Sequence, residues 1–119
     1  MASHSAAVTA LLDAVKAKDL SAAPLAENVW YQSPLSGEPI RGRAYVTRFL
    51  GAYLPVIKAV SIERVIAEDD YTAAVWRAET TFGPLSLVYV CKVEFGQITE
   101  IQAFYDPRGF LERMGNHPG

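Results

Sequence analysis

Two charged residues, Arg77 and Glu79, are the clearest candidates for chemistry in this chain. They flank Ala78 within a stretch from Tyr71 to Phe82 that alternates like a β-strand. Because residues at positions i and i+2 of a strand share a face, the two side chains are expected to touch each other or a shared partner. If that face is buried, the Glu79 carboxyl group is a candidate acid or base toward a bound molecule.

The tyrosines are a second source of polar groups. Tyr31, Tyr53, Tyr89 and Tyr105 can donate hydrogen bonds to a ligand, or they can be core aromatics whose hydroxyls bond to the backbone. The residues alone leave both interpretations open. Cys91 has no cationic or histidine neighbour in the sequence, which predicts a small buried hydrophobe rather than a nucleophile.

The inventory of metal ligands is poor. His4 and His117 are the only histidines and stand near the two ends of the chain, and no carboxylate cluster accompanies them. The single cysteine excludes an intrachain disulfide and a CxxC motif. We therefore expect neither a metal nor another cofactor.

Length and composition favour one ordinary globular domain. The chain has 119 residues, of which half are apolar and a fifth charged. We expect a single domain over residues 1–119, with its core at about 6–114 and a flexible end at 115–119. The net charge of −2 argues against nucleic-acid binding. The sequence has no signal peptide and no apolar stretch long enough for a membrane span, so a cytoplasmic location is predicted.

Three helices are expected in the first half of the chain. Val8, Leu11, Leu12 and Val15 recur at helical spacing and form one apolar stripe. Asp19 or Ser21 can cap a second, short helix that contains Pro24 in its first turn. A third helix has an apolar face from Val46 to Leu54 and ends at Pro55.

The rest of the chain has the period of β-strands. Residues 29–33 form a short strand before Pro34. From Lys58 onward, turn sequences at 68–70, 83–84 and 96–97 separate four strands and predict an antiparallel meander. Residues 110–114 are expected to form a last helical turn. The predicted fold class is α+β: a curled antiparallel sheet, shaped like a cone, with three helices on its concave side.

From Ala7 to about Met114 the chain resembles the nuclear transport factor 2-like superfamily, in its SnoaL-like branch. The stretches that carry this resemblance are KDLSAAPLAENVWYQSPLSGEPIRG, the meander, and ITEIQAFYDPRGF. The family includes ketosteroid isomerases, polyketide cyclases, limonene epoxide hydrolases and pure binding modules. The resemblance implies a pocket between the concave sheet face and the first and third helices. It also implies a homodimer through the convex sheet face.

Alternation alone does not decide which face of the strand from Tyr71 is concave, because Trp76 on the other face suits a pocket or an interface. Matching to the family puts one set of side chains inside: Tyr31, Ser33, Arg77, Glu79, Tyr89, Cys91, Val93, Ile101, Ala103 and Tyr105.

The resemblance also allows specific chemistries to be tested. For ketosteroid isomerases, the base position falls on Ser33 and the two donor positions on Leu11 and Cys91, none of which can do this chemistry. The limonene epoxide hydrolases have an Arg-x-Asp pair, which Arg77-Ala78-Glu79 is similar to. Their water-activating aspartate, however, falls on Ala103, which cannot take a proton.

The SnoaL-type cyclases use a histidine and an aspartate in the pocket. Both histidines of this chain stand near its ends, where a solvated side chain is the expected state. Asp106 matches the late acidic residue of the family. It is equally suited to a turn or to pairing with Arg108, and we favour the turn.

Two hypotheses follow. In the first, the chain is an enzyme for an apolar, oxygenated substrate, with Glu79 as acid or base, Arg77 orienting it and Tyr31 as donor. In the second, it is a non-catalytic ligand-binding or dimerisation module. In both, the ligand is a small apolar or oxygenated organic molecule, contacted by Ser33, Tyr53, Tyr89, Cys91, Ile101, Ala103 and Tyr105. A third alternative is an interaction subunit that buries a partner against Trp76.

Overall fold

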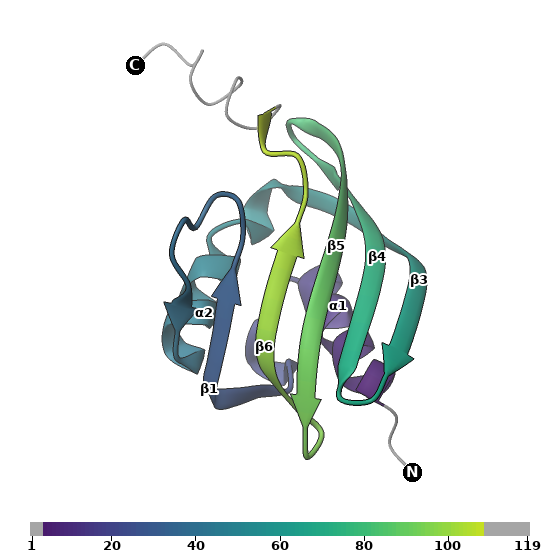
Figure 1. Cartoon of the computed structure of the whole chain (residues 1–119). Coiled ribbons are helices and arrows are strands. Elements are labelled where there is room, and N and C mark those ends of the chain that lie inside the picture. Colours follow the sequence, from purple (N-terminus) through teal and green to yellow (C-terminus); the bar gives the residue numbers. More distant parts are fainter. Residues whose placement is uncertain (1–3, 109–119) are drawn as a thin grey trace.

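The protein folds as two α-helices packed on one face of a six-stranded sheet (Figure 1). The computed structural model describes residues 4–108. The predicted helical turn at 110–114 and the flexible end at 115–119 lie outside this part. In chain order the elements are α1 (His4–Ala17), the 3₁₀ turn η1 (Leu20–Ala22), β1 (Leu25–Gln32), β2 (Ile40–Arg41), α2 (Arg43–Gly51), the 3₁₀ turn η2 (Leu54–Val56), β3 (Ile57–Glu68), β4 (Tyr71–Thr80), β5 (Gly83–Glu94) and β6 (Gln97–Phe104).

The sheet has the strand order β2-β1-β6-β5-β4-β3. The predicted meander is confirmed, because β3 to β6 pair in sequence as antiparallel neighbours. The prediction of a wholly antiparallel sheet is wrong, because β1 pairs with β6 in parallel. The sheet is mixed, curled and not closed, and the predicted cone shape is not confirmed. The short edge strand β2, which pairs with β1, had no signal in the sequence.

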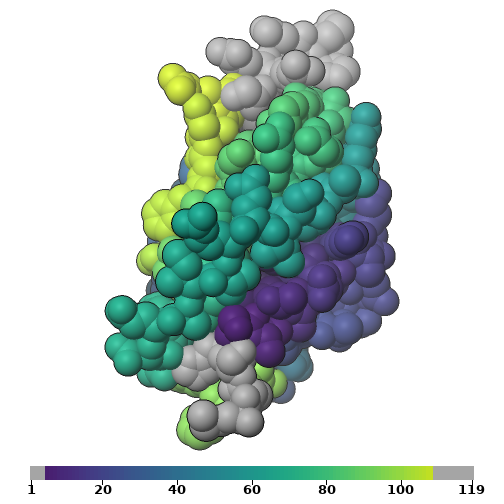
Figure 2. Space-filling model, turned by 90° about the vertical axis from the view of Figure 1, so that its right-hand side faces the viewer, coloured from purple at the N-terminus to yellow at the C-terminus, as the bar shows by residue number. Residues whose placement is uncertain are grey.

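Helix α1 covers the inner face of the meander. Its predicted stripe is confirmed, since Val8, Leu11 and Leu12 are fully buried and Val15 nearly so. Figure 2 shows the atoms of α1, in purple, lying directly against the teal atoms of β3 and β4. Burial of this stripe against the sheet holds the helix in place more than its intrinsic helical propensity does.

The prediction of three α-helices is wrong. Asp19 caps as expected, by accepting a hydrogen bond from the backbone N–H of Ser21 at 3.0 Å, but only the 3₁₀ turn η1 follows. The predicted second helix does not continue beyond η1, because Ala23 is extended before Pro24, a position that disfavours helical backbone. The third predicted helix, expected to end at Pro55, ends early at Gly51 as α2, and Pro55 lies in the separate turn η2.

Gly42 makes the passage from β2 into α2. Its φ of 98° lies in the region open to glycine, and its carbonyl accepts the first helical hydrogen bond, from the N–H of Val46. Its own N–H donates to the carbonyl of Val29 at 2.7 Å, which ties the helix start to β1. This junction sets α2 beside β1 (Figure 1).

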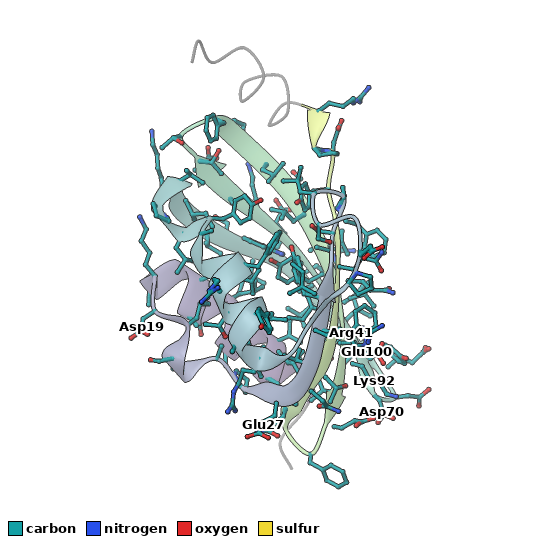
Figure 3. All side chains as sticks on the ribbon, turned by 90° about the vertical axis from the view of Figure 1, so that its left-hand side faces the viewer. Asp19, Glu27, Arg41, Asp70, Lys92 and Glu100 are labelled. Carbon is teal, nitrogen blue, oxygen red and sulfur yellow. The ribbon has the colours of Figure 1, made fainter. Side chains whose placement is uncertain are left out.

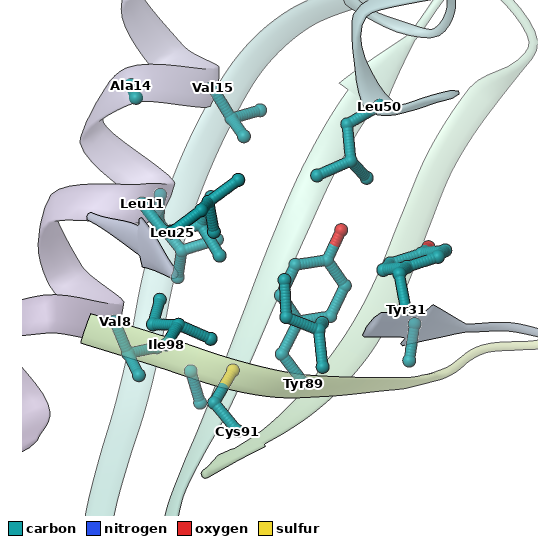
Figure 4. Close-up of a cluster of buried hydrophobic side chains, with 14 of the residues drawn as sticks. Val8, Leu11, Ala14, Val15, Leu25, Tyr31, Leu50, Tyr89, Cys91 and Ile98 are labelled. Atoms are coloured by element: carbon teal, nitrogen blue, oxygen red, sulfur yellow. The ribbon is translucent and has the colours of Figure 1, made fainter. Parts of the chain in front are cut away.

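The core lies between the helices and the inner face of the sheet. Figure 4 shows Val8 and Leu11 of α1 next to Ile98 and Cys91 of the sheet, with Tyr31, Tyr89 and Leu50 farther along the same space. Within residues 4–108, no helix has the length and apolar character that crossing a bilayer requires. The cytoplasmic location stays a prediction.

Candidate functional site

A cavity of about 60 Å³ opens at the α2 end of the core. Two strands of the meander provide one wall, through Trp76 and Ala78 of β4 and Leu87 and Tyr89 of β5. The end of α1, helix α2 and the turn η2 close the other sides. The remaining lining residues are Val15, Tyr31, Leu35, Leu50, Tyr53, Leu54, Val56, Ile57, Thr80, Leu85 and Tyr105.

Aromatic rings form a continuous wall on one side of this cavity. The rings of Trp76 and Tyr89 meet edge to face, with centroids 5.2 Å apart and planes at 78°. Tyr89 meets Tyr31 in the same manner at 6.2 Å, and Tyr31 packs on Phe49 at 5.3 Å. Such contacts add to the stability gained from burial and hold each ring in one orientation. The wall is therefore preorganised.

The hydroxyl groups of this wall form a connected set. The Tyr31 side chain lies close enough to Tyr89 and to Ser33 for each to influence its pKa. The Tyr105 hydroxyl donates to Ser33 Oγ at 3.4 Å. Figure 4 shows the Tyr89 hydroxyl pointing towards Leu50, the side on which the cavity lies. These hydroxyls are the polar groups that a ligand would meet.

The tyrosines of this set keep their protons. Burial raises the pKa of Tyr31 and of Tyr89 far above the ordinary value, and it also raises the pKa of Tyr105. At neutral pH all three are therefore neutral phenols, which donate hydrogen bonds and do not act as bases. The set suits a ligand that carries an acceptor atom.

Ser33 anchors the loop that follows β1. Its Oγ accepts hydrogen bonds from the backbone N–H groups of Leu35 and Ser36, and its own N–H donates to Ser36 Oγ at 2.8 Å. Ser33 is buried, as predicted, and its position explains why β1 stops before Pro34. The loop places Leu35 in the cavity wall.

The prediction that Arg77 and Glu79 face the pocket is wrong. Both lie on the outer face of β4 with about half of each side chain exposed, at 46% and 51%. The inner face of β4 is occupied instead by Trp76 and by Thr72, Ala74, Ala78 and Thr80, all buried. Burying one large indole is favourable, whereas burying two charges is costly, and this difference sets the orientation of the strand.

The expected contact between the two charges is confirmed. Arg77 Nε lies 3.4 Å from Glu79 Oε1. Exposed pairs of this kind contribute little to stability, and neither residue lines the cavity. The geometry therefore removes the basis for assigning Glu79 and Arg77 a role at a pocket ligand.

The other predicted site residues divide into two groups. Tyr31, Tyr53, Tyr89 and Tyr105 line the cavity. Cys91, Ile101 and Ala103 are buried on the inner face, as predicted, but they pack in the core outside the cavity lining: Cys91 and Ile101 are fully buried and Ala103 is 4% exposed. Burial raises the pKa of the Cys91 thiol to about 12, so the thiol is unreactive at neutral pH.

Trp76 is the main pocket residue that the sequence interpretation missed. It is 2% exposed, and within residues 4–108 its Nε1 atom has no hydrogen-bond partner. A buried N–H without a partner costs about 1–3 kcal/mol. The signal in the sequence was the apolar set Ala74, Trp76 and Ala78, which alternates against Arg77 and Glu79.

Asp106 lies at the end of the sheet and adopts both of its expected roles. It accepts a hydrogen bond from the backbone N–H of Arg108, which closes a turn, and its carboxylate also pairs with the Arg108 guanidinium at 2.7 Å. These contacts lower the pKa of Asp106 to about 2. In residues 4–108, no group of three or more His, Cys, Asp or Glu side chains is arranged to hold a metal ion.

Solved structures share this fold. A candidate ketosteroid isomerase from Kribbella flavida is 27% identical, with a TM-score of 0.76 over 87% of this chain and 77% of that protein. A steroid delta-isomerase from Pseudomonas aeruginosa is 20% identical, with a TM-score of 0.78 over 97% and 90%. An NTF2-like protein of unknown function from Cytophaga hutchinsonii is 15% identical, with a TM-score of 0.81 over 93% and 96%.

The sequence comparison identifies the family. A search of curated proteins finds no match to the chain. The family model of the SnoaL-like domain matches residues 8–101, which include most of α1, all of α2 and almost the whole sheet. The chain therefore belongs to the SnoaL-like domain family.

Proposed function

We propose that this protein binds a small, neutral, largely apolar molecule in the cavity between α2 and the inner sheet face. The observation that carries the proposal is the chemistry of the cavity wall: it consists of apolar side chains, tyrosine hydroxyls, one threonine and one indole, and none of the described lining residues is charged. A charged ligand would lose its hydration there and find no partner of opposite charge.

The size of the cavity limits the ligand. Pockets for drug-sized molecules measure roughly 300–1,000 Å³, whereas this cavity measures about 60 Å³. Half-buried side chains surround it, among them Leu35, Tyr53, Leu54 and Tyr105. A cavity that holds benzene measures about 150 Å³, so we propose a ligand of about one ring that enters by displacing these residues.

The wall supports binding more directly than catalysis. Tyr31 and Tyr89 can donate hydrogen bonds to a carbonyl or ether oxygen and so polarise it. A general base that would take a proton from the ligand has no candidate among the described lining residues, since these include no carboxylate and no imidazole. We therefore propose binding of an oxygenated molecule as the function, with Tyr31 kept as a donor.

Two substitutions on β4, each of an alanine by leucine, test this proposal. Ala78 lines the cavity, whereas Ala73 lies on the opposite face of the same strand. Ala78→Leu fills the cavity and is expected to weaken binding of cyclohexanone at least tenfold, while Ala73→Leu leaves it unchanged. Binding is measured through the methyl resonances of Leu50.

If Ala78→Leu does not fold, Leu50→Phe fills the same space from α2 and serves in its place, with binding then measured through the methyl resonances of Leu87. If the folded variant binds cyclohexanone with the affinity of the wild type, the ligand lies elsewhere. The proposal would then be wrong.

We also propose a homodimer through the outer face of the sheet. Both helices lie against the inner face. Figure 3 shows Arg41, Lys92 and Glu100 on the opposite, outer face. Val75, Val88 and Phe104 stand opposite one another on β4, β5 and β6 and form an apolar row, in which Phe104 is 52% exposed. A second copy of the chain would cover this row. Sedimentation velocity tests the proposal, and a single monomeric species at micromolar concentration would contradict it.

A further inference from the structure

The indole of Trp76 has an unused hydrogen-bonding capacity inside the cavity wall. Of the side chains that line the cavity in residues 4–108, Trp76 alone has a polar atom that is both closed to solvent and without a hydrogen-bond partner. An indole N–H only donates, so an acceptor atom must approach it before the cost of its burial is recovered.

The neighbours of Trp76 do not supply that acceptor. Tyr89 meets the indole edge to face, as described above, and its hydroxyl does not form a hydrogen bond with Nε1. The adjacent lining residues on the strands, Ala78 and Leu87, are apolar. The described residues therefore leave Nε1 without an acceptor, which the oxygen of a ligand can supply.

We propose that Trp76 Nε1–H donates a hydrogen bond to a carbonyl or ether oxygen of a neutral ligand, and that this bond selects oxygenated molecules over hydrocarbons of the same shape. The inference deepens the proposed function and rests on it. The buried tyrosines add to the selection, because they too are donors and their high pKa keeps them so. Since Nε1 is closed to solvent, binding includes a small movement of the wall that admits the oxygen.

Nuclear magnetic resonance of the indole N–H tests the inference directly. The chain has two tryptophans, and Trp30 does not line the cavity, so Trp30→Phe leaves Trp76 as the single indole signal. The probes are cyclohexanone and methylenecyclohexane, which has the same ring with a carbon in place of the oxygen. Cyclohexanone is expected to move the indole proton downfield, as hydrogen bonding does, and methylenecyclohexane is not.

Affinity provides the second measurement. Trp76→Phe removes the N–H and keeps an aromatic ring, so it is expected to weaken cyclohexanone binding about five- to tenfold and to leave methylenecyclohexane binding nearly unchanged. If this variant does not fold, the resonance experiment on Trp30→Phe still decides.

Three outcomes would overturn the inference, in different ways. If both probes bind and shift the indole proton alike, the cavity binds ligands but Trp76 does not select them. The same conclusion follows if the chemical shift of the indole proton does not change at saturating cyclohexanone. That result is expected if the N–H stays directed at the Tyr89 ring. If neither probe perturbs the cavity methyl groups, the proposed function fails together with the inference.

Discussion

The two faces of the sheet follow opposite rules, although the same strands build both. On β4 the inner positions hold Trp76 and four small residues, all buried, whereas Arg77 and Glu79 stand half-exposed on the outer face. On β5 the inner positions hold Leu87, Tyr89, Cys91 and Val93, and the outer ones hold Ser86, Val88, Val90 and Lys92. The comparison teaches that the inner face contributes stability and a neutral cavity, while the outer face keeps the charges in water.

The largest expected effect comes from truncating the inner face. Leu87 and Val88 are adjacent on β5 but point to opposite sides, and Leu87 is buried. Leu87→Ala is expected to lower the free energy of unfolding by about 2–5 kcal/mol, because it removes buried methyl groups and enlarges a cavity. Urea unfolding monitored by circular dichroism measures this loss.

Val88→Lys is the matched control on the outer face. It is expected to leave the stability of the monomer nearly unchanged and to prevent the proposed dimer, because it places a charge in the centre of the apolar row. The comparison of the two faces would be wrong if, with the chain held monomeric by dilution, Val88→Lys destabilised it as much as Leu87→Ala does.

An alkaline transition of intermediate size should come from the buried inner-face acids. The pKa of Cys91 rises from 9.0 to about 12 in the folded state, and those of Tyr31 and Tyr89 rise above 10.0. Above these ordinary values the unfolded chain loses protons that the folded chain keeps. The stabilising contribution of these groups to the free energy of unfolding is therefore complete below about pH 9. It falls as the pH rises, by up to about 1.4 kcal/mol per pH unit for each group.

Unfolding between about pH 8 and pH 11 measures this transition. Cys91→Ala is expected to reduce the slope, and Tyr31→Phe to reduce it further at the upper end of the range. Tyr71→Phe, at a 46% exposed position at the start of β4, is the control. A slope that responds equally to Tyr71→Phe and Tyr31→Phe would contradict the assignment to the inner face.

The smallest effect is expected from the outer-face ion pair. Glu79→Gln breaks an exposed contact with Arg77, so neither the free energy of unfolding nor the affinity for cyclohexanone should change measurably. This result would distinguish the structure from the expectation that Glu79 is the acid of a buried site. A tenfold loss of affinity in a folded Glu79→Gln protein would restore that expectation.

The sequence predicted those elements whose pattern has one interpretation. The stripe of α1 has apolar residues on one side only, and the turns of the meander carry polar residues and glycine at the right intervals. The strand β4 was different, because one face offered an arginine and a glutamate and the other a tryptophan among small residues. Matching to the family chose the wrong face, whereas the cost of burying two charges chooses the other.

Other features depended on contacts between distant parts of the chain. The parallel pairing of β1 with β6 and the short strand β2 form between segments that carry no local signal for one another. The cavity itself has the same origin, since Tyr31, Leu50, Trp76 and Tyr105 meet only through the sheet order. Of the four tyrosines of the site, Tyr31, Tyr89 and Tyr105 were placed inside by the match to the family, and Tyr53 was expected on the apolar face of the third helix.

A crystal structure of the protein soaked with cyclohexanone would test the central claim most directly. The proposal predicts the ring between Leu50, Leu87 and Trp76, with its oxygen turned towards the donors of the wall. An empty cavity at saturating ligand, or a molecule bound only on the outer face beside Arg77 and Glu79, would contradict it.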